Sequence, residues 1–99
     1  MDQDEARAKE RAAAVAEVTA RLRGRGIAVT GAEDGEDLVN LLSAVERFEA
    51  AVEAHGASSR PDDLHFVLPR RAPGEAVRAY TGRIDEATAR LRGHPRRPD

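Results

Sequence analysis

Residues 34–56, DGEDLVNLLSAVERFEAAVEAHG, contain the clearest hydrophobic periodicity of the chain. Asp34 stands where a helix N-cap is expected, and His55-Gly56 is a typical helix end. The apolar side chains advance by three and four residues, which places them on one face of an α-helix. We therefore predict a helix over residues 35–55 with a strong apolar seam. The seam consists of Leu38, Leu41, Val45, Phe48 and Val52, with Leu42 beside it.

Two further helices are predicted, one on each side of this segment. The later one covers residues 73–92, because Pro73 suits the first position of a helix and the apolar residues again step by three and four. The earlier one covers residues 4–23, but its apolar face is made mostly of alanine and is weak. The later seam contains Val77, Tyr80, Ile84, Ala87 and Leu91, and the earlier face contains Ala8, Ala12, Val15, Val18 and Leu22.

These segments predict an all-α fold, either a small three-helix bundle or a helical hairpin. Residues 1–93 would form a single domain, and residues 94–99 a flexible tail. Nineteen of the 99 residues are alanine, so the core has little apolar volume for its size. Two strong seams and one weak face make a poor closed monomer, and we therefore expect a homodimer.

The connection formed by residues 57–73 is longer than the usual link between bundle helices. Its second part contains prolines, and a residue that precedes proline is disfavoured in the α region. We predict an extended segment, and about ten extended residues would span roughly 33 Å, one helix length. Such a segment is compatible with parallel or antiparallel packing of the second and third helices. Its apolar side chains either cover the bundle or bind a partner protein; they are Leu64, Phe66 and Leu68.

A short β-pairing is the alternative for the same segment. Residues 27–30, IAVT, have the composition of a short strand, and so do residues 65–68, HFVL. The two segments could pair within one chain or between two chains.

Arg70 and Arg71 directly precede the third predicted helix, whose N-terminal end already carries partial positive charge. An anion bound there would satisfy both guanidinium groups and the N–H groups of Gly74 and Glu75. The simpler interpretation is that the acidic residues 62–63, or a carboxylate of a neighbouring chain, neutralise the arginines. An anion or small-ligand site at this helix end is therefore our alternative function.

The composition argues against several classes of function. Charged residues make up 34% of the chain but the net charge is only −2, which does not favour nucleic acid or anionic membranes. The absence of cysteine excludes disulfides and thiolate metal sites, and no spacing of His, Asp and Glu indicates a metal site. No nucleophile motif indicates an enzyme. We expect no cofactor and no membrane span.

The remaining expectation is a small cytoplasmic protein that acts through protein–protein contact. It would be an accessory or self-assembling protein, with its specific surface in the segment of residues 61–71 that contains Leu64, Phe66, Leu68, Arg70 and Arg71. Fifteen arginines against one lysine are typical of a bacterial, high-GC coding bias.

Overall fold

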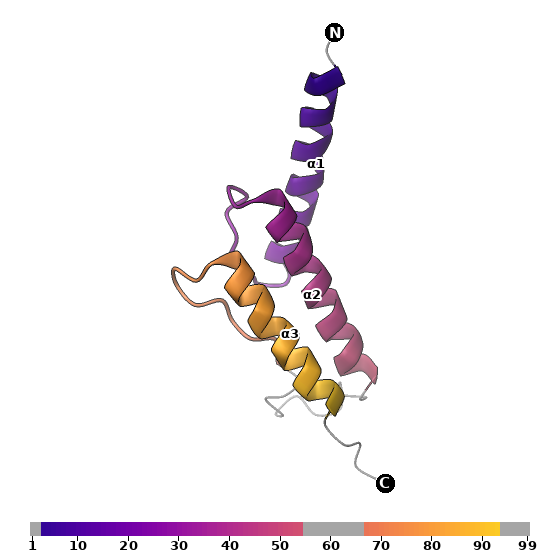
Figure 1. Cartoon of the computed structure of the whole chain (residues 1–99), viewed down its shortest axis with the longest axis vertical. Helices are drawn as coiled ribbons and strands as arrows, with labels where there is room; N and C mark the ends of the chain where they lie inside the picture. Colours follow the sequence, from indigo (N-terminus) through magenta and orange to yellow (C-terminus); the bar gives the residue numbers. More distant parts are fainter. Residues whose placement is uncertain (1–2, 55–66, 94–99) are drawn as a thin grey trace.

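The structure, a computed structural model, describes residues 3–54 and 67–93. It contains three helices, α1 (Gln3–Gly24), α2 (Gly35–Ala54) and α3 (Val77–Gly93), and no strand among the described residues (Figure 1). The prediction of a small all-α bundle is therefore confirmed. The predicted end of the second helix at residue 55 and the predicted tail, residues 94–99, lie outside the described residues.

Helix α2 forms the centre of the molecule and packs against both α1 and α3. Its N-terminus is capped as predicted, because the N–H groups of Glu36 and Asp37 lie 2.9 and 3.3 Å from Oδ1 of Asp34. The acidic first turn also suits the positive end of the helix dipole. The predicted seam is buried except for Val52, which is partly buried against the core. The buried side chains of α2 are Leu38, Leu41, Leu42, Ala44, Val45, Phe48 and Ala51.

Helices α2 and α3 run in the same direction. Two ion pairs show this direction: Asp37 with Arg78 at 2.9 Å, and Arg47 with Asp85 at 3.0 Å. Both pairs advance along the two helices in the same order, as only parallel helices allow. Figure 1 shows the same arrangement. Of the two arrangements left open by the sequence, the chain thus adopts the parallel one.

Helix α1 also runs parallel to α2, but only its C-terminal half is packed. Gly35 lies against Val15, where an added Cβ would come within 2.8 Å of the valine Cγ2. Farther along, Arg25 pairs with Glu49 at 3.0 Å. Residues 4–14 are all exposed and extend past the start of α2 (Figure 1). We call residues 4–14 the free half of α1.

The connection between α1 and α2 returns the chain to the start of the bundle without regular structure. Gly26, at φ 78°, lies in the turn that follows α1, and the N–H groups of Arg25 and Ile27 both donate to the carbonyl of Leu22. Ile27 and Val29 are buried in the core. Residues 27–30 form no strand; of their predicted partner segment, residues 65–66 lie outside the described residues and residues 67–68 form no strand.

Helix α3 begins at Val77, later than the predicted start at Pro73. Pro73 and Gly74 instead occupy the central positions of a turn, in which the Glu75 N–H donates to the Ala72 carbonyl at 3.0 Å. Gly74 has φ 75°, the conformation that the third position of a type II turn requires. The Pro-Gly pair therefore forms a turn instead of starting the helix.

Candidate functional site

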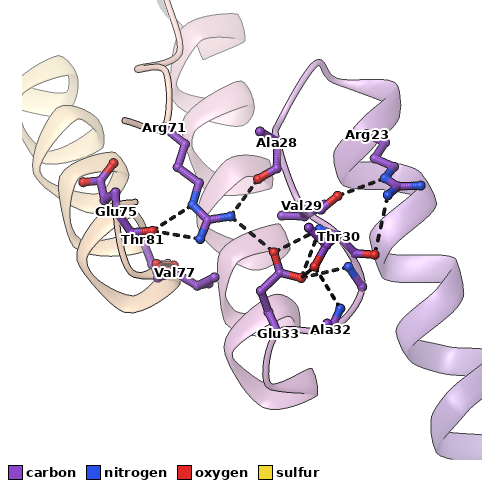
Figure 2. A network of polar contacts seen from close by, with 11 residues as sticks. Arg23, Ala28, Val29, Thr30, Ala32, Glu33, Arg71, Glu75, Val77 and Thr81 are labelled. Atoms are coloured by element: carbon purple, nitrogen blue, oxygen red, sulfur yellow. Dashed lines mark hydrogen bonds and ion pairs between the residues drawn. The ribbon is translucent and has the colours of Figure 1, made fainter. Parts of the chain in front are cut away.

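A cluster of polar contacts around Glu33 holds the turn that precedes α2 (Figure 2). Oε1 of Glu33 accepts hydrogen bonds from the Thr30 hydroxyl and the Gly31 N–H, both at 2.8 Å. The Thr30 N–H lies 3.0 Å from both carboxylate oxygens, and the Thr30 hydroxyl accepts a bond from the Ala32 N–H. The side chain of Glu33 is only 15% exposed. The turn of residues 30–33 is thus closed by its own side chains.

These contacts change the acidity of Glu33. Burial by itself raises the pKa of the carboxyl group, because it disfavours the charged form. The hydrogen bonds from the Thr30 N–H and hydroxyl and from the Gly31 N–H favour the charged form and outweigh burial. The pKa is lowered to about 2, from 4.5. Glu33 is therefore a carboxylate over the whole physiological pH range.

Arg71 joins this turn to the segment that precedes α3 (Figure 2). Its Nη1 donates to the Ala28 carbonyl at 2.7 Å and lies 3.3 Å from Oε2 of Glu33. Its Nε and Nη2 both donate to the Glu75 carbonyl, at 3.0 and 2.8 Å. The side chain is only 18% exposed. We call Arg71, Glu33 and their hydrogen-bond partners the Arg71–Glu33 cluster.

A second set of contacts fixes the segment before α3 to that helix. The Tyr80 hydroxyl donates to the Pro69 carbonyl at 2.7 Å. Arg83 donates to both carboxylate oxygens of Glu75 at 2.7 Å, and to the Arg70 carbonyl at 2.6 Å. The hydrogen bonds from Arg83, followed by the Ala72 N–H, lower the pKa of Glu75 to about 2. Residues 69–75 are therefore held along their length.

The two lowered pKa values predict acid sensitivity. A carboxyl group with a folded-state pKa of about 2 and an unfolded-state value of 4.5 stabilises the fold above pH 4.5. That stabilisation is lost as the pH falls from about 4.5 towards 2. We expect the melting temperature, followed by circular dichroism, to fall steeply across this window. Glu33→Gln should show a smaller fall than wild type, whereas Glu10→Gln on the free half should match wild type. A melting temperature unchanged between pH 5 and pH 3 would contradict the prediction.

The structure describes three of the five predicted site residues; Leu64 and Phe66 lie outside the described residues. Leu68 is partly buried and packs against the core. Arg70 is exposed, and Arg71 is occupied by protein acceptors. With α3 beginning at Val77, the Glu75 N–H is also used within the turn. This geometry does not favour an anion site at Arg70 and Arg71.

A groove lies beside the C-terminal half of α1. We call it the α1 groove; its volume is about 600 Å³. Its wall is the turn held by the Arg71–Glu33 cluster, and its two ends carry arginines. Arg23 lies against the wall, donating to the Val29 carbonyl at 2.9 Å. The floor consists of Ala12, Val15, Ala16, Thr19 and Ala20. Arg11 and Arg23 lie at the two ends, and Thr30, Gly31 and Glu33 form the wall.

The charges at the two ends of the groove are not neutralised. Among the described residues, neither Arg11 nor Arg23 forms an ion pair with a carboxylate. Glu33, the acidic residue of the wall, is already paired with Arg71. The groove therefore combines an apolar floor with two cations, a combination that suits an occupant with small apolar residues and carboxylates.

Thr19 carries an unpaired polar atom in this groove. The residue is only 7% exposed, and its hydroxyl has no hydrogen-bond partner among the described residues. Two other helical threonines differ from it, because the hydroxyls of Thr81 and Thr88 donate to the carbonyls four residues earlier, each at 2.9 Å. A buried hydroxyl without a partner costs free energy, so Thr19 is a position at which the fold of the single chain leaves a hydrogen bond unmade.

A substitution tests this description of Thr19. In the monomer, Thr19→Val should raise the free energy of unfolding by about 1 kcal/mol, because a methyl group replaces an unsatisfied hydroxyl. Thr88→Val is the matched control, since that hydroxyl is bonded, and it should be neutral or destabilising. Chemical denaturation at low micromolar concentration measures both. A loss of stability in Thr19→Val would mean that its hydroxyl has a partner within the chain.

The sequence contained only part of the signal for this site. The spacing Thr30-x-x-Glu33 is that of a capping box, so the bond from the Thr30 N–H to the Glu33 carboxylate could have been anticipated. The pairing with Arg71 could not, because it joins residues 38 positions apart. The groove depends on the direction of α2 relative to α1, which no local pattern specifies.

Two further observations bear on function. Within residues 3–54 and 67–93, no three His, Asp or Glu side chains come together as metal ligands. In the same part of the chain, no helix has the length and apolar character needed to cross a membrane. Comparison of the chain with protein-family models, with curated proteins and with solved structures gave no match, so its function has to be argued from its own geometry.

Proposed function

We propose that this protein acts by association with another protein chain through α1, and that it forms a homodimer. The observation that carries the proposal is the free half of α1, whose residues 4–14 are all exposed. The C-terminal half of the same helix is packed on α2, with Leu22 fully buried. The helix thus continues for about 16 Å beyond the part that residues 15–54 and 67–93 cover.

The physical argument is that a helix of this kind gains from a partner. Isolated helical segments shorter than about 12 residues are marginal in water, because few hydrogen bonds repay the cost of ordering the chain. The free half is rich in alanine, which favours the helix, but it buries no side chain of its own. A second chain packed along it would supply the missing burial. The proposal assigns no catalytic step to the protein.

Sedimentation velocity and hydrogen exchange test the proposal together. From low micromolar to near-millimolar concentration, we expect a shift from monomer to dimer, with slower amide exchange in residues 4–14. Exchange in the middle of α2 should not change, because it is already buried. Ala12→Arg should abolish both effects, whereas Ala14→Arg, on the opposite side of α1, should leave them intact. A monomer at every concentration would refute the homodimer.

The alternative function, anion binding at Arg70 and Arg71, can be tested directly. Thermal denaturation with and without millimolar phosphate would measure any stabilisation through Arg70 and Arg71. We expect none, because Arg71 already donates to carbonyl groups and to Glu33. A clear rise in melting temperature with phosphate, lost in Arg70→Ala, would favour the alternative.

A further inference from the structure

One stripe of α1 is symmetric in spacing and complementary in charge. Reading along the helix, the stripe begins with an acidic residue, continues with four alanines and ends with a basic residue. The steps between its members are three, four, four, four and three residues, so the stripe has the same spacing in both directions. Because steps of three and four share a helix face, its members lie side by side. They are Glu5, Ala8, Ala12, Ala16, Ala20 and Arg23.

Such a stripe matches itself when reversed. In an antiparallel pair of α1 helices, Glu5 of one copy lies opposite Arg23 of the other, and Ala12 lies opposite Ala16. Alanine side chains allow the two helices to approach closely. Like charges do not meet along the stripe, and the opposite charges at its ends favour this register over shifted ones. The stripe therefore favours a two-fold symmetric contact.

The free half of α1 and the α1 groove match each other in length. The free half, residues 4–14, is a helical segment without a covering surface, about 16 Å long. The α1 groove runs from Arg11 to Arg23, about 18 Å along the helix, and no described segment of the same chain fills it. In the antiparallel register, residues 5–17 of one copy lie along residues 11–23 of the other. The free half of each copy would therefore enter the groove of the other.

The unpaired hydroxyl in the groove is an independent indication of an occupant. Thr19 lines the groove, is 7% exposed and has no hydrogen-bond partner among the described residues. The same register places Lys9 of the second copy level with Thr19. The Thr19 oxygen is buried in the single copy, so it would accept a bond from the Lys9 ammonium group once the Thr19 side chain rotates towards the groove.

We propose that two copies of this chain pair antiparallel through α1, each placing its free half in the α1 groove of the other. This inference rests on the proposed homodimer and specifies its surface and register. Two reciprocal contacts of an alanine-rich helix bury a modest apolar area, so the dimer is expected to be of about micromolar affinity and to dissociate on dilution.

Single cysteine substitutions test the register directly, since the chain contains no cysteine and any disulfide must join two copies. A mixture of Ala12→Cys and Ala16→Cys should form a mixed disulfide, because the register brings these positions within bonding distance. Ala14→Cys is the control: residue 14 is level with itself in the second copy but faces away, and it should not crosslink. Non-reducing electrophoresis and mass spectrometry identify the products.

The outcomes separate the two proposals. A monomer at all concentrations refutes the homodimer and the register together. A dimer that crosslinks no faster through the 12–16 mixture than through Ala14→Cys leaves the homodimer standing and overturns the register.

Charge and hydroxyl variants provide a second measurement of the same contact by sedimentation. Glu5→Arg should weaken the dimer by about tenfold, because it places like charges beside Arg23 of the second copy. Glu10→Arg changes the net charge equally on another face and should leave the affinity unchanged. Thr19→Val should also weaken the dimer, although it stabilises the monomer. Equal effects of Glu5→Arg and Glu10→Arg would overturn the register.

Discussion

Arg71→Met is expected to lower the free energy of unfolding by about 3 kcal/mol, since removing one member of a largely buried ion pair leaves its partners unsatisfied. The methionine keeps the apolar stem but donates no hydrogen bond. The Glu75 carbonyl loses two donors, and the Ala28 carbonyl and Glu33 lose one each. For a domain of this size the loss would be a large share of the total stability. Chemical denaturation followed by circular dichroism measures it.

Arg71→Lys separates geometry from charge. Lysine keeps the positive charge near Glu33 but cannot place donors on two carbonyls and a carboxylate at once, because its ammonium group is a compact point charge. We expect it to recover less than half of the loss. Arg70→Met is the matched control, since that side chain is exposed, and it should change stability by less than about 0.5 kcal/mol. Equal effects of Arg70→Met and Arg71→Met would contradict the role assigned to the cluster.

The helices were predictable because their signals are local. The three-and-four spacing of α2 and its Asp34 cap lie within one stretch of sequence, and both predictions are confirmed. On α1, the predicted apolar face is correct only where α2 covers it. Leu22 is buried, whereas Ala8 and Ala12 are exposed. Periodicity identifies a face that can be buried, and the length of the neighbouring helix decides how much of it is buried.

The connections were harder to predict because the same residues fit two structures. Pro73 suits the first position of a helix and also the second position of a type II turn. Gly74 has φ 75°, which suits the turn and is incompatible with a helix, so α3 starts at Val77. The direction of α3 depends on long-range packing against α2, in which side chains such as Ile84 and Leu91 are buried. No local pattern specifies such contacts.

The proposed α1 contact was missed for a different reason. By their small volume alone, the alanines of α1 predict only a weak core face. In the structure most of them lie on exposed surface, where small size allows close approach of another helix. The same alanines therefore predict a weak core face from the sequence, but a surface for helix–helix contact once the buried part of α1 is known.

Leu22→Ala is expected to lower the free energy of unfolding by about 3 kcal/mol, in the range found for buried leucines. Its side chain is fully buried in the core, and the substitution leaves a cavity where α1 packs on α2. Ala13→Gly, in the free half, is the comparison. Glycine costs about 1 kcal/mol within a helix, but a segment without tertiary contacts unfolds locally before the rest of the chain. Ala13→Gly should therefore cost less than about 0.5 kcal/mol at low micromolar concentration.

The comparison between these two variants distinguishes the two halves of α1. If the C-terminal half stabilises the fold and the free half binds a second copy, Leu22→Ala should change stability at every concentration. Ala13→Gly should instead weaken the dimer, because glycine raises the free-energy cost of ordering the helix that enters the groove. Denaturation and sedimentation on the same two samples measure both effects. If Ala13→Gly lowers the free energy of unfolding of the monomer by the full amount of about 1 kcal/mol, residues 4–14 unfold together with the rest of the chain. They would then not be a separate segment available for association.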